Sequence, residues 1–311
     1  MNEINSSLDL SGEIPIVPLR NWGRWVSAGI IAAAAVALIV ELSHAQIVWG
    51  DIPKYFLYRS MIQGMWGTVL LACASQAMGI VLGVFVAIMR RSKNPVMSWL
   101  AWFYIYVFRG IPVLVELFIW FNLALAFKSV GIPGVFSIST NTLITPFVAA
   151  LLGLGLNESA YYAEIVRAGF NSVDHGQVEA AHSIGMTPAK TMRRVILPQA
   201  MRVIIPPTGN DFINMLKATS LASAISYHEL LLAAGNIYSV NFRIMEGLMA
   251  AALWYMVLVS IASVGQYFLE KRFGSDRSNP STMALKKSWR RSMNPGGVFK
   301  RFGVVGGPVT P

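Results

Sequence analysis

Charged residues are scarce in this chain of 311 residues: they make up 13% of it, whereas hydrophobic residues make up 55%. Soluble globular domains carry about 25% charged residues, so this scarcity excludes an ordinary soluble domain. Several windows instead exceed the roughly 18–20 apolar residues that an α-helix needs to cross a bilayer. We therefore expect an all-α, polytopic membrane protein.

The chain also has little that could hold a metal or a disulfide framework. Its single cysteine, Cys73, lies in an apolar run, which excludes a disulfide framework and a cysteine-based metal site. The histidines do not cluster at ligand spacing, so no metal site is predicted. They are His44, His175, His182 and His228.

A phosphate-binding loop of the Walker A type is missing as well. The nearest string, GMTPAKT at residues 185–191, lacks the second glycine before the lysine and follows no strand. Its proline also removes one backbone N–H group that such a loop would need. No second carboxylate, nucleophile or base stands in a catalytic relation to Glu179 in the same region. We predict no catalytic residues, no ATP hydrolysis and no cofactor bound by this chain itself.

What the chain does have is a series of long apolar runs. They predict about five core spans, at residues 61–89, 112–127, 142–167, about 203–225 and about 247–268. Gly79 and Gly83 in the first span, and Ala149 and Gly153 in the third, have the four-residue spacing that permits close helix contact. Residues 97–108 are rich in aromatic side chains, which suits a segment lying at the membrane interface.

Positive charge is distributed unevenly between the predicted loops. The net charge is +10, with 25 lysines and arginines. A nucleic-acid binder could be as basic, but here the cations lie in loops and a tail, so no nucleic-acid partner is predicted. Four cations (Lys54, Arg59, Lys128 and Arg243) fall in external loops and Lys217 falls within a span. The other 20 lie on the predicted cytoplasmic side, in agreement with the positive-inside rule.

The two ends of the chain differ from this core. Residues 1–24 are predicted to be a cytoplasmic extension, and residues 25–49 an extra transmembrane helix. The alternative for the latter is a cleaved signal peptide, because Ser43, His44 and Ala45 resemble a signal-peptidase site. Residues 273–311 are basic, contain proline and glycine without periodicity, and are predicted to be a disordered cytoplasmic tail.

A polar, basic stretch at residues 171–207 lies between two apolar runs. Asp174 is suited to cap a first short helix, in which Val178, Ala181 and Ile184 recur on one face. Gly185 suits the left-handed residue that ends such a helix. Thr187 and Pro188 then suit the start of a second helix, and Pro198 is expected to break it. The pattern predicts a rigid helix–turn–helix, with an ordinary amphipathic interfacial loop as the alternative.

Four separated motifs carry a family resemblance. They are FRGIPVL at 108–114, NESAYYAEIVR at 157–167, GQVEAAHSIG followed by Leu-Pro at 176–198, and KATSL at 217–221. Together they resemble the permeases of ABC importers, in particular the polar amino-acid branch with its EAA motif. The resemblance covers about residues 58–272. Ala218 stands where the family usually has Asp, and Glu116 where Gln is common, and both departures could bear on substrate choice.

The resemblance implies an importer of amino acids or related compounds, with the fold of a type I ABC-importer transmembrane domain. Residues 58–272 would form the permease core and residues 171–200 a cytoplasmic coupling loop. A separate ATPase subunit would bind ATP and Mg²⁺ and touch that loop. The ATPase-contacting residues implied are Gln177, Glu179, Ala180, Ala181, Gly185, Leu197 and Pro198.

The resemblance also implies further partners and a location. A second permease subunit, identical or homologous, would complete the path, and an external solute-binding protein would deliver the solute. The place implied is a bacterial plasma (inner) membrane, with the spans in contact with lipid and the coupling loop and C-terminus in the cytoplasm. Polar amino acids, opines and related compounds all remain open as solutes.

Polar residues inside the spans are candidates for the solute path. Asn210, Asn214 and Lys217 recur at i, i+4 and i+7 on one helix face, and Thr219 and Ser220 follow them. Glu116 lies in another span, where an ionised group is costly and usually faces a bundle interior or a wet cavity. Glu116 and Lys217 could meet the amine and carboxylate of a zwitterionic solute. The alternatives are a structural Glu–Lys pair or polar contacts that hold helices together.

Two rival functions are compatible with the pattern alone. A membrane scaffold or assembly protein could dock a cytoplasmic partner without moving solute, although the intramembrane polar stripe argues against it. A secondary transporter would predict inverted repeats and broken helices, and no convincing internal repeat is found.

Overall fold

The computed structural model describes residues 22–44, 46–132 and 136–273. The chain divides into two units, residues 1–48 and residues 49–311, and each is described by itself. Residues 1–21 of the predicted cytoplasmic extension, and the predicted tail from residue 274 onward, lie outside the described residues.

In the first unit the described residues form one helix, α1 (Trp22–His44). Its apolar part, Trp25–Glu41, is shorter than the roughly 20 residues of a typical span. The predicted extra helix is therefore helical, while its role as a retained span or a cleaved signal stays a prediction.

The second unit is built around α3 (Arg59–Arg90) and α8 (Pro146–Asn171), which pack along each other. A 3-10 turn, η1 (Trp49–Asp51), and α2 (Ile52–Phe56) precede them. The small residues predicted to permit close contact do so. A Cβ at Gly83 would lie 2.8 Å from the Ser159 carbonyl oxygen, and one at Gly153 would lie 2.7 Å from Leu117 Cδ2. At both positions only glycine allows the neighbouring element to approach this closely.

Between α3 and α8 the chain makes a sharp bend. Asn94 caps α4 (Pro95–Gly110), since its Oδ1 accepts a 3.0 Å bond from the Val96 N–H. Helix α5 (Val113–Phe121) then leaves at 101° to α4. Ile111 is extended at the bend because Pro112 disfavours the helical conformation in the residue before it. The span predicted at 112–127 is thus the second half of a bent pair.

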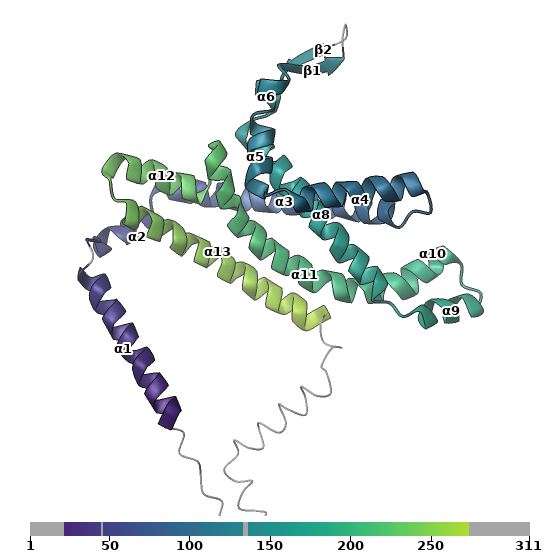
Figure 1. Ribbon diagram of the computed structural model, residues 1–311, viewed down its shortest axis with the longest axis horizontal. Helices are drawn as coiled ribbons and strands as arrows, with labels where there is room; N and C mark the ends of the chain where they lie inside the picture. The colour runs from purple at the N-terminus through teal and green to yellow at the C-terminus, as the bar shows by residue number, and fades with distance from the viewer. Residues whose placement is uncertain (1–21, 45, 133–135, 274–311) are drawn as a thin grey trace, which may run out of the picture. The chain divides into compact units, whose positions relative to one another are not determined.

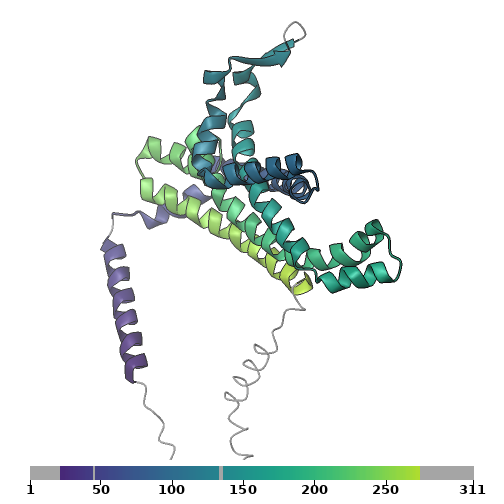
Figure 2. The same ribbon diagram turned by 45° about the vertical axis from the view of Figure 1, so that its right-hand side comes forward.

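A short hairpin follows α5, where the sequence predicted only a loop. Helix α6 (Leu123–Ala126) leads into strands β1 (Ser129–Ile132) and β2 (Phe136–Ser139), which pair antiparallel with Ser129 opposite Ser139. Helix α7 (Thr140–Leu143) returns the chain to α8. The hairpin extends beyond the end of α5 in both views (Figures 1 and 2).

After α8 the chain forms α9 (His175–Ser183), α10 (Pro188–Thr191) and a π-helical turn, η2 (Met192–Ile196). Helix α11 (Leu197–Ala218) continues directly from that turn, and the 3-10 segment η3 (Thr219–Ile225) follows the end of α11. The expected break at Pro198 is wrong: Pro198 lies in the first turn of α11, where its missing N–H costs little. The wider π turn before it joins the two helices without a loop.

The last two helices are α12 (Leu230–Asn241) and α13 (Ile244–Phe273). Glu229, which is buried, caps α12 with both carboxylate oxygens: Oε1 accepts from Leu232 N–H at 2.7 Å and Oε2 from Leu231 N–H at 2.9 Å. Such a cap offsets the cost of burying a carboxylate because it satisfies two N–H groups at the positive end of the helix.

Two described helices, α3 and α13, are long and apolar enough to cross a membrane, and the bent pair α4–α5 makes a third. Helices α8 and α11, with 26 and 22 residues, also have the necessary length at about 1.5 Å per residue. Both α8 and α11 carry polar residues within their length, and some of these residues belong to the candidate site.

Candidate functional site

Residues 171–200, predicted to be the coupling loop, form a compact unit whose first helix has a cap at each end. Asp174 Oδ1 accepts a 2.6 Å bond from the Gly176 N–H at the start of α9. At its end Gly185 is left-handed, with φ +76°. The Met186 N–H donates to the Ala181 carbonyl at 3.0 Å and the Gly185 N–H to that of His182 at 2.9 Å. These two bonds form a Schellman motif, which confirms the helix–glycine–helix pattern read from the sequence.

One side of α9 anchors it and the other is open. Ala181 is buried, and Val178 packs against the cluster that includes Val173 and Ile196. Ile184 was expected to lie on the same face of α9 as Val178 and Ala181. This is wrong, since Ile184 lies beyond the last turn of the helix and is 78% exposed. Thr187 stands at the start of α10 but makes no side-chain cap bond.

The residues predicted to contact an ATPase divide between these two sides. Gln177, Glu179, Ala180 and Gly185 are exposed, as are Leu197 and Pro198 at the start of α11, whereas Ala181 holds α9 in place. The Glu179 side chain is exposed and forms no hydrogen bond or ion pair within the described part of the chain, so its carboxylate is available to a partner. Helix α9 is thus held in place through its buried side, and its opposite side is exposed.

The polar stripe on α11 is exposed among the described residues, and Asn210 at one end of it lines a cavity that α11 shares with α13. Asn210, Asn214 and Lys217 are all exposed along one side of the helix. Thr219 is buried and Ser220 is half-buried, and their hydroxyls donate at 2.8 Å to the Leu216 and Lys217 carbonyls respectively. A polar stripe on a membrane-spanning helix is costly against lipid. This side of α11 therefore requires water, solute or another protein against it.

Glu116 does not lie on that stripe. It is 3% exposed, and its Oε1 accepts a 3.2 Å bond from the Asn157 amide, which also donates at 2.6 Å to the Phe108 carbonyl. No ion pair joins Glu116 to Lys217 in the part of the chain that the structure describes. The alternative of a structural Glu–Lys pair is thus not observed.

Two other carboxylates, Glu158 and Asp211, come together inside the protein, and the sequence reasoning missed them. Glu158 on α8 accepts a 3.3 Å bond from the Gln76 amide on α3, and Asp211 on α11 is close enough to act on it electrostatically. No lysine or arginine among the described residues pairs with either carboxylate. An acid in a predicted span was the available signal, but Glu158 was read only as part of the motif at 157–167 and Asp211 was not considered.

A cavity of about 480 Å³ lies between α3, α8, α11 and α13, and Gln76, which donates to Glu158, lines it, whereas Glu158 and Asp211 themselves do not. Gln76 and Gln266 both line it and are more than nine-tenths buried, and the Oε1 atom of each has no hydrogen-bond partner. Asp211 Oδ2 is likewise buried and unpartnered. Buried polar atoms are normally satisfied, so these acceptors are suited to donors from water or a solute. Because no lysine or arginine is among the described residues that line this cavity, these acceptors favour a positively charged ligand.

Known proteins resemble this chain in both sequence and fold. Residues 79–275 match the family model described as "Binding-protein-dependent transport system inner membrane component". The chain is 45% identical over 266 residues to the "Arginine transport system permease protein ArgU" of Corynebacterium glutamicum, covering 84% of each chain. It is 40% identical over 215 residues to the "Probable amino-acid permease protein YxeN" of Bacillus subtilis, covering 69% of this chain and 91% of that relative.

A solved structure described as "Crystal structure of an amino acid ABC transporter with histidines" is similar to 73% of this chain and all of its own. The TM-score is 0.64, and the identity is 36%.

Proposed function

Because the chain belongs to the family of binding-protein-dependent transport system inner membrane components, we propose that α9 couples amino-acid import to ATP hydrolysis in another subunit. As a member, the chain is the permease subunit of an amino-acid ABC importer, a multi-pass inner-membrane protein, and not the ATPase. Its partners are an ATPase and a solute-binding protein. This assignment decides against the membrane scaffold and the secondary transporter.

The observation that carries the coupling proposal is that one side of α9 is exposed while its other side is fixed to the rest of the loop. Gln177, Glu179 and Ala180 are exposed, while Ala181 and the Schellman turn fix the helix to the rest of the loop. Since η2 continues into α11 without a loop, a push on α9 moves that span as a rigid body. ATP and solute must then prefer different conformations, because coupling arises only from such differences.

Charge reversal on α9 tests this proposal. The Glu179→Lys variant should lose the co-purifying ATPase and the uptake of amino acid, while the permease still reaches the membrane. The matched control is Asp51→Lys, a reversal outside the coupling loop. If the Glu179→Lys complex keeps its ATPase and its uptake, the docking proposal fails.

We further propose that a second permease subunit, identical or homologous, covers the polar side of α11. An isolated chain would present Asn210, Asn214 and Lys217 to lipid, at a cost that a facing subunit removes. Two such stripes would line a common path for the solute. Glu116 is buried with Asn157 instead, so its part in the path stays a prediction.

The solute that best fits the interior is a cationic amino acid. Glu158 and Asp211 supply two carboxylates without a basic partner among the described residues, and Glu158 accepts from Gln76, whose unsatisfied oxygen lines the cavity together with that of Gln266. A guanidinium offers five N–H donors and a permanent positive charge, which suits such a set of acceptors. The relative named for arginine transport supports the same class.

We propose the hairpin β1–β2 and helix α12 as the surface for the solute-binding protein. Both belong to segments that the positive-inside rule places outside the cell. Val130 and Ile138 on the hairpin are exposed, and so is Val240 on α12, so each element offers apolar area to a partner.

A further inference from the structure

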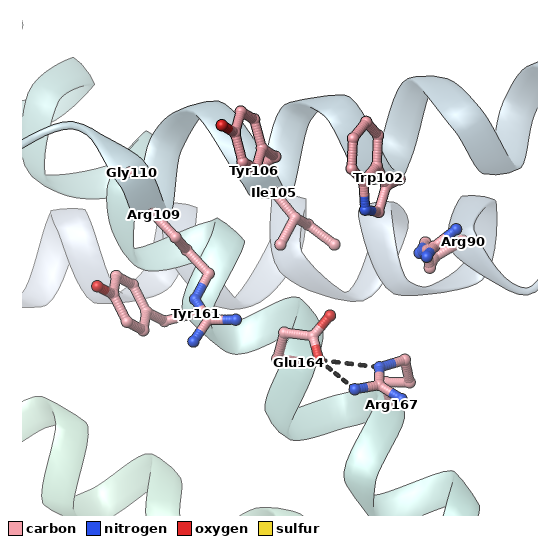
Figure 3. A pocket seen from close by; sticks show the side chains of 9 residues that line it. All are labelled: Arg90, Trp102, Ile105, Tyr106, Arg109, Gly110, Tyr161, Glu164 and Arg167. Atoms are coloured by element: carbon pink, nitrogen blue, oxygen red, sulfur yellow. Dashed lines mark hydrogen bonds and ion pairs between the residues drawn. The ribbon is translucent and has the colours of Figure 1, made fainter.

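A second cavity, separate from the carboxylate pair, lies between the end of α3, helix α4 and the later part of α8 (Figure 3). Its volume is about 670 Å³, within the range of ordinary small-molecule sites. Three arginines from three different helices line it, together with aromatic rings. The main lining residues are Arg90, Trp102, Tyr106, Arg109, Tyr161 and Arg167.

The cavity carries surplus positive charge. Glu164 is the one carboxylate among its lining residues, and it is already bound by Arg167, whose Nε donates to Oε2 at 2.9 Å. Arg90 instead donates at 3.1 Å to the Ser98 hydroxyl, and Arg109 lies over the Tyr161 ring, 4.9 Å from its centre. Two guanidiniums therefore have no carboxylate partner within the described residues, and both can turn their remaining N–H groups to an anion.

An apolar, aromatic face adjoins this charge. Along α4, Trp99 stacks on Phe103 and Trp102 on Tyr106, with ring centres 5.6 and 5.5 Å apart. All four rings are exposed, and two of them also line the cavity. Amphipathic rings of this kind are enriched where proteins meet the headgroup level of a bilayer. The cavity also lies at the ends of α3 and α8 that the positive-inside rule places toward the cytoplasm.

We infer that this cavity binds the phosphodiester headgroup of an anionic phospholipid of the cytoplasmic leaflet, with the acyl chains along the α4 aromatic face. Arginine forms paired, charge-assisted bonds to phosphate oxygens, and basic pockets between spans on this side of a membrane are suited to anionic headgroups. A soluble phosphate would use the guanidiniums but leave the adjoining aromatic face uncovered. The ligand is therefore a lipid, and the site is independent of the solute path.

Lipid retention by the assembled transporter tests the site. The complex is placed in nanodiscs of phosphatidylcholine containing phosphatidylglycerol, and tightly bound lipid is counted by native mass spectrometry during titration. Each arginine replaced, in Arg90→Gln and Arg109→Gln, should weaken phosphatidylglycerol binding about fivefold, and the double variant should weaken it more than either single change. The control Lys93→Gln removes an exposed cation next to the end of α3 that does not line the cavity, and should change nothing.

Two further measurements distinguish a bound lipid from a free anion in this cavity. Glycerol phosphate in solution should not displace the bound lipid, and displacement at equal concentration would make this a site for a free anion and overturn the proposal. Unchanged lipid binding by the double variant would also overturn it. Should the double variant fail to assemble, photoactivatable phosphatidylglycerol is used on the unaltered complex. Labelling must then fall within residues 95–110, and labelling only elsewhere contradicts the site.

Discussion

At the scale of single residues, the proximity of Glu158 and Asp211 could not be predicted from the sequence pattern. They are 53 positions apart and sit on different helices, and only the packing of α8 against α11 brings them together. The stripe of Asn210, Asn214 and Lys217, by contrast, was predictable because helical periodicity alone places these residues on one face. The burial of Glu116 beside Asn157 depends on the α4–α5 bend, which composition does not reveal.

Removing one of these charges should weaken arginine binding. In Asp211→Asn or Glu158→Gln, a charge-assisted hydrogen bond to the guanidinium is lost, so the dissociation constant should rise by about tenfold or more. Calorimetric titration of the permease–ATPase complex with arginine measures it, with Asp51→Asn as the control for loss of an external acid. Arginine affinity unchanged in both variants would remove the carboxylates from the solute site.

Close helix contact at Gly83 gives a second residue-scale prediction. A valine there would push against the Ser159 carbonyl and Tyr162, which are parts of the opposing helix and cannot simply turn away. Overpacking of this kind costs about 1–3 kcal/mol, so the thermal midpoint of Gly83→Val should fall by several degrees. Gly29→Val on α1, where nothing lies within 4 Å of the added Cβ, should leave it unchanged. Equal midpoints for the two variants would argue against tight α3–α8 packing.

At the scale of elements, the signals for the two ends of α9 were reliable, whereas the expectations for Ile184 and Pro198 were wrong. Asp174 and Gly185 marked the ends of α9 correctly because capping needs only neighbouring residues. Pro198 was expected to break a helix, but the π turn before it lets α10 run into α11. The β1–β2 hairpin was missed because four-residue strands carry too little alternation to stand out.

The turn after α9 should respond to the shape of residue 185. An alanine at φ +76° is disfavoured by about 1 kcal/mol, while asparagine tolerates this conformation better. Hydrogen exchange at the Gly185 and Met186 amide positions, which close the Schellman motif, should rise about fivefold in Gly185→Ala and less in Gly185→Asn. Equal exchange in all three proteins would mean that the left-handed turn does not hold the loop.

At the scale of the whole molecule, one chain offers only part of a transport path. The polar side of α11 is open in the single chain, and α9 needs a partner to move it. The family resemblance in the sequence implied this incompleteness, because a second permease subunit would be needed to complete the path. The sequence could not place the interior cavity, which several helices form together.

A cross-linking experiment tests the facing subunit. In a Cys73→Ser background, Asn214→Cys should cross-link to the second permease subunit through a short reagent, because the α11 stripes face each other across the path. Ile261→Cys, at an exposed apolar position on α13, should react with a lipid-soluble maleimide but form no such cross-link. If position 214 instead reacts only from the lipid phase, the stripe does not line a shared path.

The most direct test of the account is a photo-cross-linking residue in place of Ala180, on the exposed face of α9, in sealed inside-out vesicles. If α9 receives the motion of the ATPase, the cross-linked product contains that ATPase, and its yield changes with bound nucleotide. Cross-links to lipid alone, or labelling of this position only from the opposite side of the membrane, would contradict the account.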